Sequence, residues 1–146
     1  MKLDFKLILD KERKEEVVVY AKEKTALVKE IEELVNKSQE SIIGYNSDEM
    51  IRLNPKEVYC FTIENNKLYA VMENDKLLIK QRLYQLEEEL DNDFVKINQS
   101  SIANIKKIDR FKATLGGSLI VLFKNGYRDY VSRRQARYVK ERLGVK

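Results

Sequence analysis

From residue 42 onward the sequence is a succession of short apolar segments separated by turn residues, and this pattern leaves few folds open. The segments are rich in Ile, Val, Tyr and Phe, and Asn-Pro, Asn-Asn, Asn-Asp, Gly-Gly and Asn-Gly pairs interrupt them. Such segments are typical of antiparallel strands joined by hairpins. The alternation of strands and helices that builds a parallel sheet is missing from the sequence. We expect strands at residues 42–45, 50–53, 58–64, 68–73, 77–80, 94–97, 105–115, 119–124 and 127–131.

Two helices interrupt this series of strands. Leucines with helical spacing predict a short helix at residues 83–90. A second helix follows Ser132, which stands three residues before Gln135, the spacing of a capping box, and ends before Gly144, a suitable residue for the C′ position. The apolar face of this last helix comprises Ala136, Val139 and Leu143.

Two connections carry further expectations. Asn125-Gly126 is a strong hairpin signal, and it suggests a type I′ turn with positive φ at both residues. Residues 100–104 are expected to form a tight turn or a single helical turn, with Asn104 in a structural role.

The first 45 residues differ from the rest and are predicted to form a β-β-α extension. Apolar residues alternate with mostly polar ones at residues 3–9, residues 17–21 read as a second strand, and residues 24–37 have an apolar helical face. A unit this small cannot bury so much apolar surface by itself. We expect it to form a homodimer interface, and packing on its own chain is the alternative.

Charge is distributed unevenly along the chain. Residues 105–146 contain 12 Lys or Arg and 3 Asp or Glu, whereas residues 1–104 contain 16 and 21, so a basic end with a net charge of +9 follows an acidic body with a net charge of −5. This asymmetry favours a polyanionic partner, nucleic acid first and an anionic membrane second. A solvated basic surface without a partner is the plain alternative.

Several kinds of chemistry are not expected from this composition. The chain has no histidine, which excludes Ser-His and Cys-His catalytic pairs and His-based zinc sites, and its single cysteine, Cys60, lies in an apolar strand pattern that favours an inert buried thiol. The acidic clusters at residues 87–89 and 91–93 read as solvated surface. We expect no enzyme activity, no metal site and no cofactor. The absence of a long apolar run and of a signal peptide favours a cytoplasmic protein.

Four segments in a fixed order resemble the LytTR DNA-binding domain of bacterial transcription regulators. They read VYCFTIENNKLYAV, RLYQLEEEL, FVKINQSSIANIKKI and VLFKNGYRDYVSRRQARYVKERLG. The resemblance covers residues 46–146. The extension before it resembles that of short stand-alone regulators in the family, and 40 residues cannot form the receiver domain that many other members carry.

The resemblance implies both a fold and a function. The implied fold is of the α+β class, mainly β: an elongated stack of small antiparallel sheets with short helices. The implied function is that of a sequence-specific transcription regulator, which binds double-stranded DNA in the major groove through loops and the start of the last helix. Related stand-alone proteins are often encoded beside a small multi-span membrane protein that inhibits them, so such a partner is also implied. The alternative is a basic module that binds a protein or membrane surface without reading DNA sequence.

Three places carry the implied contacts with DNA. They are the hairpin loop with Asn66 and Lys67, the segment Asn98-Gln99-Ser100, and the helix start with Arg133 and Arg134. Lys107 and Arg137 are predicted phosphate contacts, and Lys106, Arg110, Lys112 and Arg128 are weaker candidates. Each place has a simpler interpretation: turn residues, a helix cap and solvated charges. Gln99 stands where relatives often have Arg or Asn, so the target sequence cannot be transferred from them.

Overall fold

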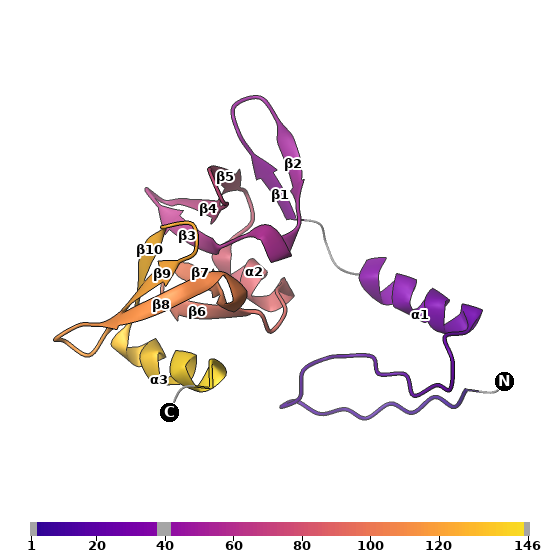
Figure 1. Cartoon of the computed structure of the whole chain (residues 1–146). Coiled ribbons are helices and arrows are strands. Elements are labelled where there is room, and N and C mark those ends of the chain that lie inside the picture. Colours follow the sequence, from indigo (N-terminus) through magenta and orange to yellow (C-terminus); the bar gives the residue numbers. More distant parts are fainter. Residues whose placement is uncertain (1–2, 38–41, 145–146) are drawn as a thin grey trace. The chain divides into compact units, whose positions relative to one another are not determined.

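The computed structural model describes residues 3–37 and 42–144, which belong to two compact units, residues 1–39 and 40–146. In the first unit the predicted helix is confirmed as α1 (Ala26–Lys37), shown in Figure 1. Its start is capped by Thr25, whose hydroxyl accepts a hydrogen bond from the Val28 N–H at 3.3 Å. Among the described residues, no helix has both the length and the apolar character that crossing a bilayer requires.

The two strands predicted before α1 are not formed. Residues 3–25 contain neither strand nor helix, which corrects the β-β-α interpretation of this segment. Phe5 and Leu9 are 90% and 88% exposed, so these two side chains are not packed on a protein surface. A single pair of strands is marginally stable in water without such a surface.

The second unit is built on a seven-stranded antiparallel sheet. Its strand order is β2-β1-β5-β4-β3-β7-β6. A 3₁₀ turn (η1, Pro55–Glu57) precedes β3, and the helix α2 (Leu83–Glu89) connects β5 to β6. The strands are β1 (Ile42–Tyr45), β2 (Met50–Leu53), β3 (Cys60–Glu64), β4 (Lys67–Val71), β5 (Lys76–Ile79), β6 (Phe94–Asn98) and β7 (Ser101–Asn104).

A three-stranded antiparallel sheet and the last helix complete this unit. The strands β8 (Ile108–Ala113), β9 (Leu119–Phe123) and β10 (Arg128–Val131) pair in the order β10-β9-β8. A second 3₁₀ turn, η2 (Ile105–Lys107), links β7 to β8, and α3 (Arg133–Arg142) follows β10 directly. Together the two sheets and the short helices confirm the predicted α+β, mainly β class.

Each face of the seven-stranded sheet carries its own hydrophobic core. Phe61 and Ile102 belong to the core shared with α2, whereas Cys60 and Ala103 belong to the core shared with the three-stranded sheet and α3. Neighbouring residues along a strand point to opposite faces, so this division follows from the alternation of side chains. The strands β3, β4, β6 and β7 therefore contribute to a core on each face, whereas β1, β2 and β5 contribute to the core on one face alone.

Three local predictions differ from the structure, and one is that residues 105–107, expected to begin a strand, form η2. Residues 101–104 form strand β7 instead of a turn, because the polar Ser101 and Asn104 are buried there and bonded to distant residues. The Asn125-Gly126 hairpin exists, but only Gly126 has positive φ (89°), and its N–H donates to the Phe123 carbonyl at 3.0 Å. The observed loop is a turn that ends in a left-handed glycine, another common hairpin geometry, and the Asn125 side-chain amide donates to the Met72 carbonyl at 2.8 Å.

Candidate nucleic-acid interface

Ser132 fixes the start of α3 through its hydroxyl and its N–H, in addition to the helical bonds that its carbonyl accepts. Its hydroxyl accepts from the Gln135 N–H at 3.3 Å, which confirms the predicted N-cap. Its own N–H donates to the Ile97 carbonyl of β6 at 2.9 Å. In a complete capping box this N–H would donate to the Gln135 side chain instead. On the inner face Ala136 and Val139 are buried. The basic side chains of α3 consequently face solvent, and they include Arg133, Arg134 and Arg137.

Gln99 is exposed in the turn between β6 and β7, and Asn98 holds that turn in place. Asn98 is only 2% exposed. Its side-chain amide donates to the Tyr130 carbonyl at 2.8 Å and to the Asp129 carboxylate at 3.1 Å, and its carbonyl accepts from the Ser100 N–H at 2.8 Å. With every partner found inside the protein, Asn98 supports the turn instead of facing solvent. Gln99 is exposed and Ser100 is half-buried.

The turn between β3 and β4 lies next to the β6–β7 turn. Asn65 and Asn66 have φ values of 51° and 65°, the left-handed conformation that a type I′ turn requires at both positions. Asn and Asp tolerate this conformation better than most residues. Two residues before Asn65, the Ile63 N–H donates to the Ser100 carbonyl at 2.9 Å. This bond brings the two turns together, with Asn65, Asn66 and Lys67 exposed.

Three segments that are distant in sequence therefore meet at one edge of the second unit. The Ile63–Ser100 bond joins the β3–β4 turn to the β6–β7 turn, and the Ser132–Ile97 bond joins the latter to α3. The start of α3 also lies beside the β8–β9 turn (Figure 1), where a side chain at Gly117 would meet the Arg133 stem at 3.1 Å. The structure thus brings together the three places that the sequence singled out.

Lys107 does not belong to this group. It lies in η2, beyond the end of β7 that is opposite to the Gln99 turn. Its ammonium group stands 4.9 Å from the centre of the Tyr59 ring. Arg137 is one helical turn beyond Arg133, is exposed, and has its Nε 3.4 Å from a Glu141 carboxylate oxygen. Lys107 is therefore separate from the assembled edge, whereas Arg137 continues it along α3.

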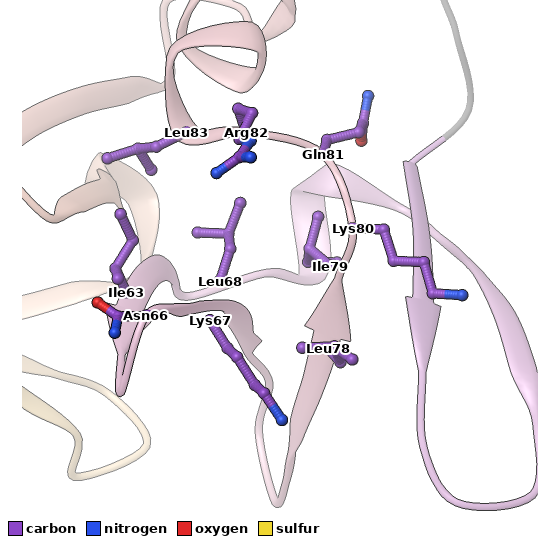
Figure 2. A pocket seen from close by; sticks show the side chains of 10 residues that line it. All are labelled: Ile63, Asn66, Lys67, Leu68, Leu78, Ile79, Lys80, Gln81, Arg82 and Leu83. Atoms are coloured by element: carbon purple, nitrogen blue, oxygen red, sulfur yellow. The ribbon is translucent and has the colours of Figure 1, made fainter.

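A shallow pocket of about 310 Å³ adjoins the β3–β4 turn (Figure 2). Its floor is apolar and includes Leu68 and Ile79, and Arg82 points over that floor while Lys80 points outward. Lys67 of β4 and Lys80, the residue after β5, are neighbours, since Leu68 pairs with Ile79. No carboxylate lines the pocket. Sequence reasoning missed Lys80 and Arg82, because the strand register brings Lys80 beside Lys67 and only the folded chain brings Arg82 to the same pocket.

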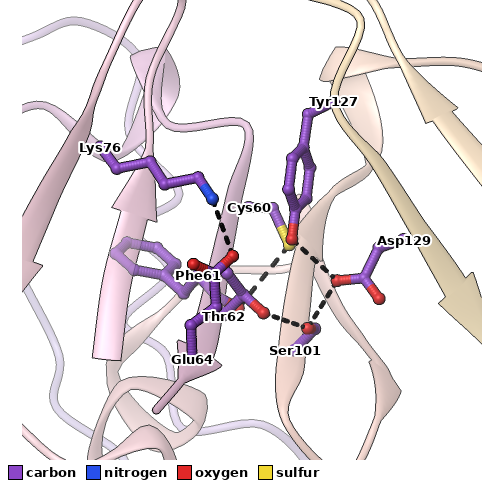
Figure 3. Close-up of polar contacts among 8 residues, drawn as sticks. All are labelled: Cys60, Phe61, Thr62, Glu64, Lys76, Ser101, Tyr127 and Asp129. Carbon is purple, nitrogen blue, oxygen red and sulfur yellow. Dashed lines mark hydrogen bonds and ion pairs between the residues drawn. The ribbon is translucent and has the colours of Figure 1, made fainter. Parts of the chain in front are cut away.

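A polar network lies between the two sheets beneath this edge (Figure 3). The Thr62 and Ser101 hydroxyls are 2.7 Å apart, and Ser101 also donates to the Asp129 carboxylate at 2.7 Å. Burial, and next the negative charge of Asp129, raise the pKa of Tyr127 above its ordinary value. The same two causes raise the pKa of the Cys60 thiol. Cys60 is fully buried and protonated at neutral pH, as the sequence predicted.

The assembled edge offers hydrogen-bond donors and positive charge. Amide groups come from Asn66 and Gln99, and guanidinium groups come from Arg133, Arg134 and Arg137. Amides can pair with an adenine edge, and guanidinium groups can bind guanine or phosphate. Among residues 3–37 and 42–144, no cluster of three or more Cys, Asp or Glu side chains could hold a metal ion.

Comparison with known proteins agrees with this arrangement. A family model described as the LytTr DNA-binding domain matches residues 48–144. An uncharacterized HTH-type transcriptional regulator from Staphylococcus aureus strain MSSA476 is 31% identical over 147 residues, which cover 99% of each chain. A second protein of that description, from strain NCTC 8325, is 31% identical over 105 residues, which cover 72% of this chain and 71% of the relative.

A solved structure shares the fold. It is the LytTr DNA-binding domain of a Bacillus cereus protein described as a methyl-accepting/DNA response regulator. It matches with a TM-score of 0.67 and 23% identity, and the match covers 72% of this chain and 98% of the other.

In the second unit five strands separate α2 from α3, so these two helices do not form a helix-turn-helix. On its sequence, its relatives and its fold, the chain belongs to the LytTR family of DNA-binding domains.

Proposed function

We propose that this protein is a sequence-specific transcription regulator that binds double-stranded DNA with the edge formed by the β3–β4 turn, the β6–β7 turn and the start of α3. The observation that carries the proposal is the convergence of these three segments through the Ile63–Ser100 and Ser132–Ile97 main-chain bonds. Membership of a DNA-binding family supports it. The net charge of +9 in residues 105–146, which include α3, also supports it, because a polyanion is attracted to this region.

The exposed side chains divide into two roles. Arg133 or Arg134 contacts a guanine in the major groove, and Gln99 and Asn66 contact bases through their amides. The phosphate contacts come from Lys67, Ser100 and Arg137, and from Lys80 and Arg82 beside the pocket. Asn98 acts by shaping its turn, because its side chain is buried and fully bonded. This assignment changes Asn98 from a predicted contact to a supporting residue.

The test is discrimination between DNA sequences at one salt concentration. The protein is allowed to select duplexes from a randomised pool, and its affinity for the selected duplex is compared with that for a scrambled duplex of equal length. Electrostatic binding alone would treat both duplexes alike, whereas base contacts favour the selected one by orders of magnitude. Equal affinity for both duplexes, together with binding to anionic vesicles, would instead support the basic surface-binding module.

The first unit is assigned to dimer formation within this proposal. Its exposed apolar side chains are unusually many for so short a segment, and they include Phe5, Leu7, Ile8, Leu9, Val17, Val18, Tyr20, Leu27 and Leu34. A second copy of the chain would cover this surface and would link two DNA-binding units, so that the second half-site is bound at a high effective concentration. An inhibitory multi-span membrane partner stays a prediction from the family resemblance.

A further inference from the structure

The carboxylate of Asp129 accepts four hydrogen bonds, and these occupy both of its oxygens. Oδ1 accepts from the Asn98 amide at 3.1 Å and from the Tyr130 N–H at 2.8 Å. Oδ2 accepts from the Ser101 hydroxyl at 2.7 Å and from the Tyr127 hydroxyl at 3.2 Å. Figure 3 shows the contacts of Ser101 and Tyr127 with this carboxylate. Among the described residues, Asp129 takes part in no ion pair.

Two of these donors stand at opposite ends of the β6–β7 turn. Asn98 is the last residue of β6 and Ser101 is the first residue of β7, and Gln99 lies between them at the surface. A single carboxylate thereby holds both ends of the turn that carries Gln99. The neighbouring Tyr130 carbonyl adds a third bond, since it accepts from the Asn98 amide at 2.8 Å.

The strand that contains Asp129 leads directly into α3. Asp129 lies in β10, which ends at Val131, and Ser132 then caps the helix that carries Arg133 and Arg134. We propose that Asp129 is a positioning residue for DNA recognition, which fixes the Gln99 turn relative to the arginines at the start of α3. This inference rests on the proposed function. Asp129 itself need not touch DNA.

The negative charge of Asp129 makes the expected change in DNA affinity different from that of a simple electrostatic effect. An unpaired carboxylate close to a DNA-binding surface repels phosphates, so on electrostatic grounds its removal should strengthen binding to any duplex. If Asp129 is a positioning residue, however, its removal should weaken binding to the selected duplex alone. Asparagine has nearly the same shape, but its amide nitrogen cannot accept a hydrogen bond, so Asp129→Asn leaves donors of the turn without an acceptor.

The experiment compares Asp129→Asn with Asp109→Asn in the full-length protein. Both variants lose one negative charge, and Asp109 lies exposed on β8, with one oxygen 3.7 Å from the Arg110 Nε. The probes are the duplex that the wild-type protein selects from a randomised pool and a scrambled duplex of equal length. We expect Asp129→Asn to reduce the ratio of the two affinities about tenfold or more, the loss typical of one misplaced base contact.

Asp109→Asn should leave that ratio unchanged, and both variants should bind the scrambled duplex at least as well as the wild type does. The inference is overturned if Asp129→Asn melts as a folded protein and keeps the wild-type ratio. It is also overturned if the selected duplex binds Asp129→Asn more tightly, as removal of charge alone would predict.

A second pair of variants keeps the test decisive if Asp129→Asn does not fold. Ser101→Ala and Tyr127→Phe each remove one hydroxyl from the same oxygen of Asp129, but only Ser101 belongs to the turn. Ser101→Ala should lower the affinity ratio severalfold, and Tyr127→Phe should keep it. Equal ratios in the two variants would contradict the inference. If instead the wild-type protein selects no duplex at all, the proposed function fails, whatever the variants do.

Discussion

At the scale of single residues, the exposed arginines of α3 are distinguished by their position along the helix. Arg134 is the second residue of α3, and positive charge at a helix N-terminus opposes the helix dipole. Arg133 is the first residue of α3 and also lies at this N-terminus, and its side-chain stem lies close to Gly117 in the β8–β9 turn. Lys140 and Arg142 lie in the last turn, where the dipole favours cations. The two arginines at the start therefore have no stabilising role from the dipole, which agrees with a role in binding.

We predict that Arg134→Ala weakens binding to the selected duplex by about 1–3 kcal/mol and relaxes the preference for one base pair. The reason is the loss of a bidentate contact with a base edge. Competition between duplexes that vary at each position measures both effects. Lys140→Ala is the matched control on the same helix, and it should weaken all duplexes about equally. Unchanged affinity and preference in Arg134→Ala would remove this residue from the interface.

A second prediction concerns stability at high pH. Cys60 and Tyr127 have ordinary pKa values of 9.0 and 10.0, and both pKa values are raised in the folded protein, first by burial. The unfolded chain therefore releases these protons first, so their contribution to stability is complete below about pH 9 and is lost progressively as the pH rises.

Thermal or denaturant unfolding between about pH 7 and pH 10.5 should show this loss, and Cys60→Ala should show a smaller one over the same range. For each protein, the free energy of unfolding at high pH is compared with its own value at about pH 7, because Cys60→Ala also changes the packing of the core. If the stability of the variant and that of the wild type depended on pH in the same way, the buried Cys60 thiol would not contribute to the loss of stability at high pH.

At the scale of elements, α3 depends on Ser132. Ser132→Ala should lower the free energy of unfolding by about 1 kcal/mol, because the Gln135 N–H loses the hydroxyl as an acceptor and keeps only the Ser132 carbonyl at 3.0 Å. It should also weaken DNA binding, because the same residue sets the direction in which α3 leaves β10. Thr25→Ala is the matched control, since Thr25 caps α1 at the same 3.3 Å but in the other unit. If Ser132→Ala unfolds like the wild type and still loses affinity, its hydroxyl contacts phosphate directly.

The elements that the sequence predicted well are those defined by local patterns. Alternating apolar residues and turn pairs placed most strands of the second unit, and helical spacing placed α1, α2 and α3. Strand β7 was missed because its polar residues read as a turn. Asn104 in that strand donates to the Val58 carbonyl at 2.8 Å, 46 residues away, and no local pattern contains such a partner. The structural role predicted for Asn104 is nevertheless confirmed by its burial.

The candidate interface was predictable in its parts but not in its arrangement. The three segments of the candidate interface were identified through a resemblance to a family, whereas the burial of Asn98 and the four hydrogen bonds of Asp129 were not predicted. The bond between these two side chains spans 31 positions in the sequence. The proximity of Lys80 to Lys67 depends in the same way on the pairing of β4 with β5. Contacts of this kind are set by tertiary structure, and composition or periodicity does not encode them.

At the scale of the whole molecule, the two units differ in how completely they bury their apolar residues. The second unit has two hydrophobic cores, and the first leaves large apolar side chains such as Phe5 and Tyr20 about nine-tenths exposed. We predict that the full-length protein is a homodimer at micromolar concentration without DNA, since closed twofold dimers are the commonest oligomers. Sedimentation of the full chain and of a chain beginning at residue 40 measures this.

The shortened chain should be monomeric, because it lacks the exposed apolar segment. Its β-sheet spectrum should be retained, since both cores lie within residues 42–144. A monomeric full-length protein would contradict the dimer, and its apolar segment would then pack on its own chain. A dimeric shortened chain would place the interface in the DNA-binding unit instead.

The burial of part of the seven-stranded sheet on both faces also has a consequence for hydrogen exchange. Backbone amides of β3, β4 and β7 are enclosed by a core on each face and by a paired strand on each side. Their exchange with deuterium should require opening of the whole unit, whereas amides in the β3–β4 and β6–β7 turns should exchange through local fluctuations. Because these turns extend from the ends of protected strands, their local opening leaves the slow-exchanging centre of the sheet closed.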